Sequence, residues 1–300
     1  MIYRILGRTG LKVSQVGLGA LEVGRPWGIG DFEGDLGLPP EESEAERFLH
    51  SVLDNGINFL DSASAYWTSE ERIGKYLSGR RDEYILASKW GEWCDETGSD
   101  YNYSPEEFWK FLESSLTKLR TEYIDLYQIH SGPLDVINNP DVMEQMNRAR
   151  EKGKIRFIGV SCGLGEAKAA IESGAFDTVQ ISYSLIDRAA ESEVLPLAEK
   201  HNIGVIIKDG LGSGRLTPKY RRWEGIEDHT AKRGAVLESW AKLQQMSLVE
   251  LALRYVLTQP AVSTVIAGTR SSSHLLENIK AASGGPLTDA QRLEAAGLAG

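Results

Sequence analysis

Four polar residues of different chemistry stand at or just after the ends of apolar segments. Asp61 ends the segment INFLD and Tyr66 follows it in the next loop, while Lys89 ends YILASK and His130 ends YIDLYQIH. A nearby ammonium favours phenolate and lowers the pKa of a phenol, which would make Tyr66 a usable proton donor. Asp61 can hold the ammonium, and His130 can hydrogen-bond the oxygen that receives the proton. The set therefore suits protonation of a carbonyl oxygen while another group attacks the carbon.

Each of these residues also has an ordinary structural interpretation. Asp61 could cap a loop, Lys89 could be solvated, and His130 could be a hydrogen-bonded core histidine. A different reaction class is a lyase or aldolase that uses Lys89 as a Schiff-base nucleophile. The nearby Asp61 argues against that class, because a carboxylate favours a protonated, non-nucleophilic amine.

A barrel of alternating strands and helices would bring the four side chains together. Short apolar runs alternate with amphipathic segments of helix length, which predicts a parallel sheet covered on its outer face. Eight such units in 300 residues predict one domain, 1–300, with the α/β fold of a (β/α)8 TIM barrel, and polar residues at the C-terminal strand ends are then candidate catalysts. The predicted strands are QVGLG, INFLD, YILASK, YIDLYQIH, IRFIGVS, TVQISY, VIIKD and TVIAGT.

Other local patterns define the rest of the architecture. The segments YRIL and LKVS flank the turn-like GRTG and predict an N-terminal β-hairpin that caps the barrel bottom. Three connections, 20–42, 91–103 and 211–245, are longer than a barrel needs, and they follow strands, so they should lie over the top face. The last one carries KYRRW and AKRG and is either a mobile loop or a lid over an anionic ligand. Capping boxes predict helix starts at Ser43 with Glu46, Ser104 with Glu107, and Ser247 with Glu250.

Composition limits the possible partners. Lys and Arg number 33 against 43 Asp and Glu, and the formal charge of −10 makes nucleic acid an unfavourable partner. The N-terminus lacks the apolar run of a signal peptide, and later apolar runs are too short to span a membrane. We therefore expect a cytoplasmic protein, a monomer or weak homo-oligomer, acting on a small carbonyl or alcohol. Cys94 and Cys162 are expected to be reduced thiols, and no metal site is predicted.

Several motifs in order resemble those of the aldo-keto reductases. They are D-x-A-x-x-Y at Asp61, Ala63 and Tyr66, S-K at Lys89 and Q-x-H at His130, followed by GKIRFIGVS, QISYSLIDR and VIAGTR. The resemblance runs from about residue 3 to about residue 282. It implies NADPH-dependent reduction of an aldehyde or ketone, or the reverse oxidation. Tyr66 would be the general acid, with its pKa lowered by Lys89; Asp61 would hold Lys89, and His130 would orient the carbonyl.

The resemblance also implies where NADP(H) binds. Ser161 and Gln180 would hold the carboxamide, and Arg270 favours NADP because a guanidinium can grip a 2'-phosphate with paired hydrogen bonds. The remaining residues expected beside the cofactor are Cys162, Lys208, Gly210, Leu211, Gly268, Thr269, His274, Glu277 and Asn278.

Two positions depart from the family pattern. Cys162 stands where asparagine is usual, so one carboxamide contact is lost or replaced. Lys208 replaces an aromatic that stacks on the nicotinamide in many members, and it could pair with Asp209, meet the cofactor pyrophosphate, or repel an oxidised nicotinamide. This departure keeps open a second function, a nucleotide-sensing NADP(H)-binding module with little turnover.

Three tryptophans are candidates for the substrate pocket wall or for a substitute stacking platform. Trp27, Trp90 and Trp93 lie in the long connections or beside Lys89. Core packing is the alternative for each of them.

Overall fold

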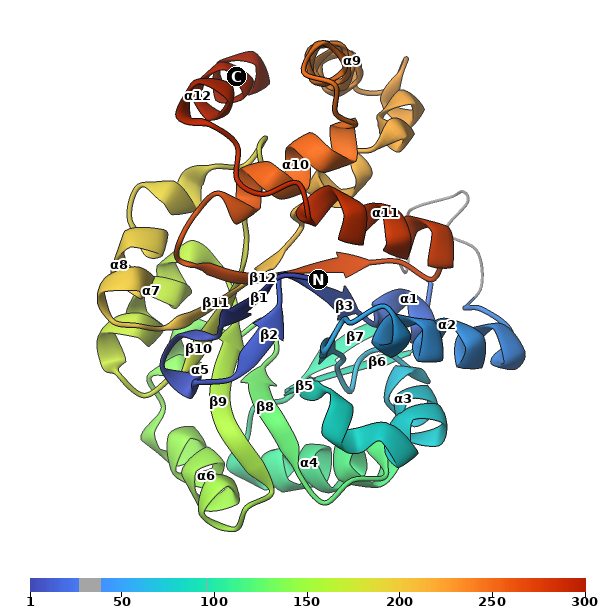
Figure 1. Ribbon diagram of the computed structural model, residues 1–300. Coiled ribbons are helices and arrows are strands. Elements are labelled where there is room, and N and C mark those ends of the chain that lie inside the picture. Colours follow the sequence, from blue (N-terminus) through green and yellow to red (C-terminus); the bar gives the residue numbers. More distant parts are fainter. Residues whose placement is uncertain (27–38, 96) are drawn as a thin grey trace.

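A closed barrel of parallel strands forms the centre of the computed structural model, which describes residues 1–26, 39–95 and 97–300 (Figure 1). All eight predicted segments form barrel strands, so the predicted (β/α)8 fold is confirmed. Around the barrel the strands follow chain order: β3 (Val16–Gly19), β4 (Phe59–Asp61), β5 (Ile85–Trp90), β8 (Ile124–Ile129), β9 (Ile155–Ser161), β10 (Thr178–Ser182), β11 (Gly204–Lys208) and β12 (Val262–Gly268), which pairs with β3.

Helices surround the barrel and cover the outer faces of its strands (Figure 1). Because both faces are covered, a strand such as β8 is buried at every position and is mostly apolar, with Asp125 and Gln128 as its polar residues. Within the described ranges, no helix is both long and apolar enough to cross a membrane. The helices are α1 (Leu21–Gly24), α2 (Glu42–Asp54), α3 (Ser69–Leu77), α4 (Pro105–Leu119), α5 (Leu134–Ile137), α6 (Pro140–Glu151), α7 (Leu164–Ser173), α8 (Val194–Lys200), α9 (Asp228–Leu243), α10 (Leu248–Leu257), α11 (Ser272–Ala282) and α12 (Asp289–Ala299).

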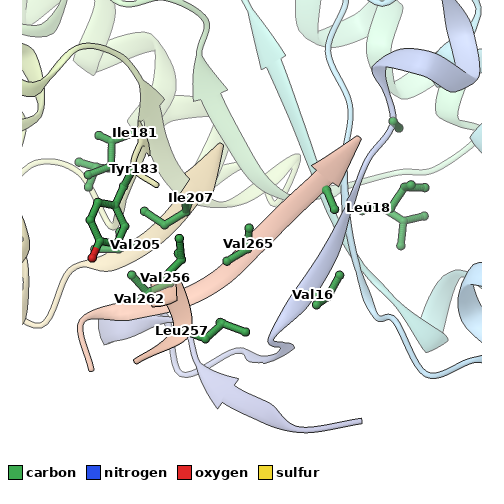
Figure 2. Close-up of a cluster of buried hydrophobic side chains, with 14 of the residues drawn as sticks. Val16, Leu18, Ile181, Tyr183, Val205, Ile207, Val256, Leu257, Val262 and Val265 are labelled. Atoms are coloured by element: carbon green, nitrogen blue, oxygen red, sulfur yellow. The ribbon is translucent and has the colours of Figure 1, made fainter. Parts of the chain in front are cut away.

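The largest core cluster lies between the barrel and its helices. Figure 2 shows side chains from four neighbouring strands, β3, β10, β11 and β12, together with Val256 and Leu257 at the end of α10. Val205 and Val265 are buried at 0% and 1% exposure. This packing fixes the strands whose C-terminal ends carry the candidate site.

Two of the three predicted helix starts are found where the capping pattern placed them. The Ser104 hydroxyl accepts a hydrogen bond from the Glu107 amide at the start of α4, and Ser247 does the same for Glu250 at the start of α10. The prediction at Ser43 is wrong, because α2 begins at Glu42 and its N-cap residue, Glu41, makes no side-chain cap.

The predicted N-terminal hairpin is present and lies across one end of the barrel (Figure 1). It consists of β1 (Tyr3–Ile5), the 3-10 turn η1 (Gly7–Thr9) and β2 (Lys12–Ser14). The Arg4 guanidinium donates to the carbonyl oxygens of Leu257, Gln259 and Val262, which lie at or before the start of β12. The hairpin therefore caps the barrel end opposite the strand C-termini, as predicted.

The long connections carry further short elements. The first contains α1, and residues 27–38, including Trp27, lie outside the described part. The second forms an antiparallel hairpin of β6 (Glu92–Asp95) and β7 (Gly98–Tyr101), in which Glu92 pairs with Tyr101. The third contains the 3-10 segments η4 (Gly212–Gly214) and η5 (Pro218–Trp223) before α9, and Arg221 of KYRRW pairs with Glu238 at 2.7 Å. Two other 3-10 segments are η2 (Ser78–Glu83) and η3 (Ala189–Glu191).

Candidate active site

The Lys89 ammonium lies at the centre of the candidate site and uses its three donors on three oxygens. It is 2.5 Å from Asp61 Oδ2, 2.9 Å from the Ser62 carbonyl and 3.3 Å from Tyr66 Oη. Asp61 ends β4 and Lys89 is the penultimate residue of the neighbouring β5. Lys89 is fully buried and Asp61 is 1% exposed, so the pair is shielded from water. The parallel strands thus bring the predicted carboxylate, amine and phenol together.

The second oxygen of Asp61 is held by two glutamines. Gln128 Nε2 donates to Asp61 Oδ1 at 3.0 Å and Gln180 Nε2 donates to the same atom at 2.9 Å. Gln128 is the glutamine of the Q-x-H motif, but the sequence analysis gave it no role of its own. These bonds fix the carboxylate that holds Lys89 and connect it to Gln180, a predicted cofactor contact.

Burial and charge act in opposite directions on the Lys89–Tyr66 pair. Burial lowers the pKa of Lys89, but Asp61 and Tyr66 outweigh it and leave that pKa above its usual value. For Tyr66, burial raises the pKa more than the Lys89 charge lowers it, and Asp61 raises it further. The sequence predicted a lowered pKa for Tyr66. The Lys89 charge does act in that direction, but burial outweighs it, so the prediction is wrong for the overall shift. Tyr66 is a neutral phenol that would give up its proton only to an oxygen developing negative charge.

His130 follows β8 and lies beside both Tyr66 and a carboxylate. Its ring meets the Tyr66 ring edge-on at 5.7 Å between centroids, and its Nδ1 is 2.7 Å from Glu92 Oε2. Burial raises the pKa of Glu92, but His130 and a 2.5 Å hydrogen bond from Ser99 outweigh it and lower that pKa to about 2. Burial lowers the pKa of His130, and Glu92 opposes this only in part. Glu92 was not predicted; the only sequence signal was its place in the long connection 91–103.

A guanidinium also reaches the site from the first connection. The Cζ atom of Arg25 lies 5.7 Å from the centroid of the Tyr66 ring, and its Nη1 is 2.6 Å from Cys94 Sγ. Its positive charge lowers the pKa of both Tyr66 and Glu92. Arg25 was not predicted, because an arginine in a long loop has no distinguishing pattern.

Of the three tryptophans considered for the pocket wall, Trp90 and Trp93 are described, and both pack against aromatic side chains of α4. Trp90 is fully buried and meets Phe108 of α4 at 5.0 Å between ring centroids, so its assignment to the pocket wall is wrong. Lys89 points into the barrel, and the next side chain on a strand must point to the opposite face. Trp93 stacks on Phe111 at 4.1 Å, which removes one face of its ring from any ligand.

The two residues expected at the carboxamide, Ser161 and Gln180, lie on neighbouring strands, and Lys208 lies on the next one. Ser161 ends β9, Gln180 lies in β10 and Lys208 ends β11, with Lys208 Nζ 3.4 Å from Ser161 Oγ. The side-chain amide nitrogen of Gln180 donates to Asp61. No described residue donates to the oxygen of the same amide, Gln180 Oε1. Cys162 is buried, and burial raises the pKa of its thiol to about 12.

The residues expected around the ribose phosphate lie where β12 leads into α11. A cavity of about 490 Å³ there is lined by Arg270, Ser271 and Ser272 on one side and, on the other, by Arg47 and Glu44 of α2 and its N-cap residue Glu41. The α11 N-terminus, capped by Ser271, contributes a positive partial charge. Of the other predicted contacts, Gly268, His274 and Glu277 are exposed, Leu211 is partly buried, and Gly210, Thr269 and Asn278 are buried.

Comparisons with known proteins identify the family of this chain. The sequence profile of the Aldo/keto reductase family matches residues 15–295. The uncharacterized oxidoreductase YqkF of Bacillus subtilis is 31% identical over 95% of this chain and 92% of its own length. The NADH-specific methylglyoxal reductase of Escherichia coli is 28% identical over 92% of each chain. The holo form of the aldo-keto reductase AKR11C1 from Bacillus halodurans superposes with a TM-score of 0.84 at 30% identity, covering 100% of this chain and 97% of its own. The chain therefore belongs to the aldo/keto reductase family.

Proposed function

We propose that this protein reduces an aldehyde or ketone to an alcohol with NADPH, with Tyr66 as the general acid. The observation that carries the proposal is the Lys89 ammonium, which contacts both Asp61 and Tyr66 in a buried setting. The nicotinamide cofactor supplies the hydride when it is bound. Tyr66 holds its proton in the resting state and gives it to the carbonyl oxygen as negative charge develops there, while Lys89 stabilises the phenolate left behind.

The residues present fit a nicotinamide cofactor. Gln180 offers a carbonyl oxygen that no described residue uses, and the Ser161 hydroxyl is beside it on the neighbouring strand. Both are hydrogen-bonding groups of the kind that a carboxamide needs. At the other end, Arg270, Arg47 and the start of α11 would hold a phosphate.

The structure argues against Lys89 as a Schiff-base nucleophile. Its donors are all engaged and its pKa is raised, so the amine stays protonated. The function is therefore assigned to proton donation at Tyr66 and not to covalent catalysis at Lys89.

The first test combines cofactor titration with turnover. We expect NADPH to quench tryptophan fluorescence on binding, and NADPH absorbance to fall when members of an aldehyde panel are added. Tyr66→Phe should reduce turnover at least about a hundredfold, the lower range for a lost general acid, and leave NADPH affinity almost unchanged. Tight binding without turnover would support the nucleotide-sensing module instead, and a Tyr66→Phe variant with most of its turnover would exclude Tyr66 as the donor.

A preference for NADPH over NADH is part of the proposal. Relatives differ in this property, since the Escherichia coli protein is named as NADH-specific. Arg270→Ala should weaken NADPH binding by roughly ten- to a hundredfold, the range for a lost charge-assisted contact, with little effect on NADH. Arg148→Ala, at an exposed arginine of α6 that does not line this cavity, is the matched control. Equal loss of both cofactors in the Arg270 variant would contradict the assignment.

A further inference from the structure

Lys208 brings a positive charge into the barrel mouth. It ends β11, pairs in register with Ser182 of β10, and directs its Nζ to Ser161 Oγ at 3.4 Å. It is largely buried, and Lys89, Asp61, Cys162 and Asp209 all act on its charge. Lys208 thus stands beside one of the two side chains proposed to hold the nicotinamide carboxamide.

Two carboxylates, Asp209 and Asp61, raise the pKa of Lys208 from a distance, but neither forms an ion pair with its ammonium. Asp209 has both oxygens occupied, since Ser182 donates to Oδ2 at 2.8 Å and Ser213 donates to Oδ1 at 3.1 Å. Asp61 is used by Lys89 and the two glutamines. Within the described ranges, no ion pair joins Lys208 to an acidic side chain. Of the three possibilities open from the sequence, pairing with Asp209 is therefore removed.

The direction of the side chain separates the other two possibilities. Lys208 Nζ contacts Ser161 of β9, one of the two side chains proposed to hold the carboxamide, and this contact favours a place beside the nicotinamide over one beside the pyrophosphate. Its charge also lowers the pKa of His130, which places it within electrostatic reach of the carbonyl site. Lys208 is thus directed to the reacting end of the cofactor.

We propose that Lys208 makes the site bind the reduced nicotinamide cofactor more tightly than the oxidised one and so favours carbonyl reduction over alcohol oxidation. This inference rests on the proposed function. The reduced ring is neutral and the oxidised ring is cationic. A nicotinamide held by Ser161 and Gln180 would therefore carry its positive charge beside the Lys208 ammonium only after the hydride and the Tyr66 proton had been transferred to the carbonyl. Like-charge repulsion then promotes release of the oxidised cofactor.

Binding measurements without any substrate test this inference. The dissociation constants of NADPH and NADP⁺ are measured by tryptophan fluorescence or calorimetry for the wild type, Lys208→Met, Lys208→Arg and Lys200→Met, an exposed control at the end of α8. We expect the ratio of the NADP⁺ to the NADPH constant to fall on the order of tenfold in Lys208→Met, the effect of a partly screened charge, and to be kept in the other variants. Met keeps the unbranched stem, and circular dichroism checks that each variant is folded.

The Lys208 charge also predicts how the ratio of the NADP⁺ to the NADPH dissociation constant depends on pH. Burial lowers the pKa of Lys208, with Lys89 acting in the same direction and Asp209, Cys162 and Asp61 opposing. The wild-type ratio should therefore decline as pH rises through the pKa of Lys208, and the Lys208→Arg ratio should stay constant because a guanidinium keeps its charge.

The other possible outcomes of these binding measurements lead to different conclusions about Lys208. An unchanged ratio in Lys208→Met would overturn the inference and leave the proposed function standing. Equal weakening of both cofactors would overturn it in favour of a phosphate contact. Unchanged cofactor constants with weaker binding of carboxylate-bearing aldehydes would assign Lys208 to the substrate instead. A wild type that binds neither cofactor would end both proposals.

Discussion

The contact between His130 and Glu92 decides which nitrogen of the imidazole can serve the substrate. Nδ1 lies 2.7 Å from the Glu92 carboxylate, which favours the neutral tautomer with its proton on Nδ1 and with Nε2 as an acceptor. A carbonyl oxygen needs a donor, which only the imidazolium provides from Nε2. Since burial lowers the pKa of His130, this form declines at a pH below the usual value of 6.5. Glu92 thus acts as a positioning residue through His130.

Glu92→Gln tests whether His130 donates a proton to the substrate oxygen from Nε2. A glutamine amide would donate to Nδ1, so the neutral imidazole would carry its proton on Nε2. We expect wild-type kcat/KM for carbonyl reduction to fall, at most about tenfold per pH unit, as pH rises through the His130 pKa, and the Glu92→Gln profile to stay flat there. NADPH affinity should be unchanged in the variant. The same pH profile in both proteins would mean that His130 does not donate to the substrate.

Among the elements, α3 carries a buried carboxyl that the reaction does not use. Glu70 is 1% exposed, and the hydroxyl of Ser88 in β5 donates to its Oε1 at 2.5 Å. Burial raises the pKa of Glu70, and the Ser88 bond opposes this only in part. A carboxyl with a raised pKa holds its proton more tightly in the folded protein than in the unfolded chain. The free energy of unfolding therefore falls as pH rises from about 4.5, the unfolded value, to the folded pKa.

Glu70→Gln should remove this loss of stability. The amide keeps the shape and can accept from Ser88, but it has no proton to lose. We expect the variant to match the wild type within about 1 kcal/mol near pH 4.5 and to be more stable at pH 8. Urea unfolding across this pH range gives the comparison. Parallel pH profiles for the two proteins would show that Glu70 does not titrate between these limits.

The strands could be predicted from the sequence because most of their positions are buried on both faces, which leaves short, mainly apolar runs. The hairpin β6–β7 could not, since it pairs locally over the barrel mouth and most of its side chains are polar. Glu92 and Arg25 could not be predicted either. Glu92 contacts His130 and Arg25 lies beside Tyr66 only because of how the two long connections fold. The assignment of Trp90 to the pocket wall was avoidable, because a strand on which Lys89 faces inward must turn the next side chain, Trp90, outward.

In the molecule as a whole, stability and chemistry occupy opposite ends of the barrel. The N-terminal hairpin closes the bottom, where Leu6 is fully buried and Arg8 donates to Asp177 before β10 at 3.2 Å. The residues of the candidate site all stand at the other ends of the strands or in the loops beyond them. Changes at the bottom should therefore alter the free energy of unfolding and leave ligand binding intact.

Arg4 provides the sharpest test of this separation. Its guanidinium donates to the Leu257 carbonyl at 2.6 Å, to Val262 at 2.7 Å and to Gln259 at 3.2 Å. Arg4→Met would leave these acceptors without their charged donor, and we expect a loss of about 2–4 kcal/mol in the free energy of unfolding. Arg4→Lys should lose less, since an ammonium can still serve one or two of the carbonyls. NADPH affinity and kcat of the folded variants should equal those of the wild type. A large change in either quantity at full folding would mean that the hairpin influences the site through the strands, and that the two ends of the barrel are coupled.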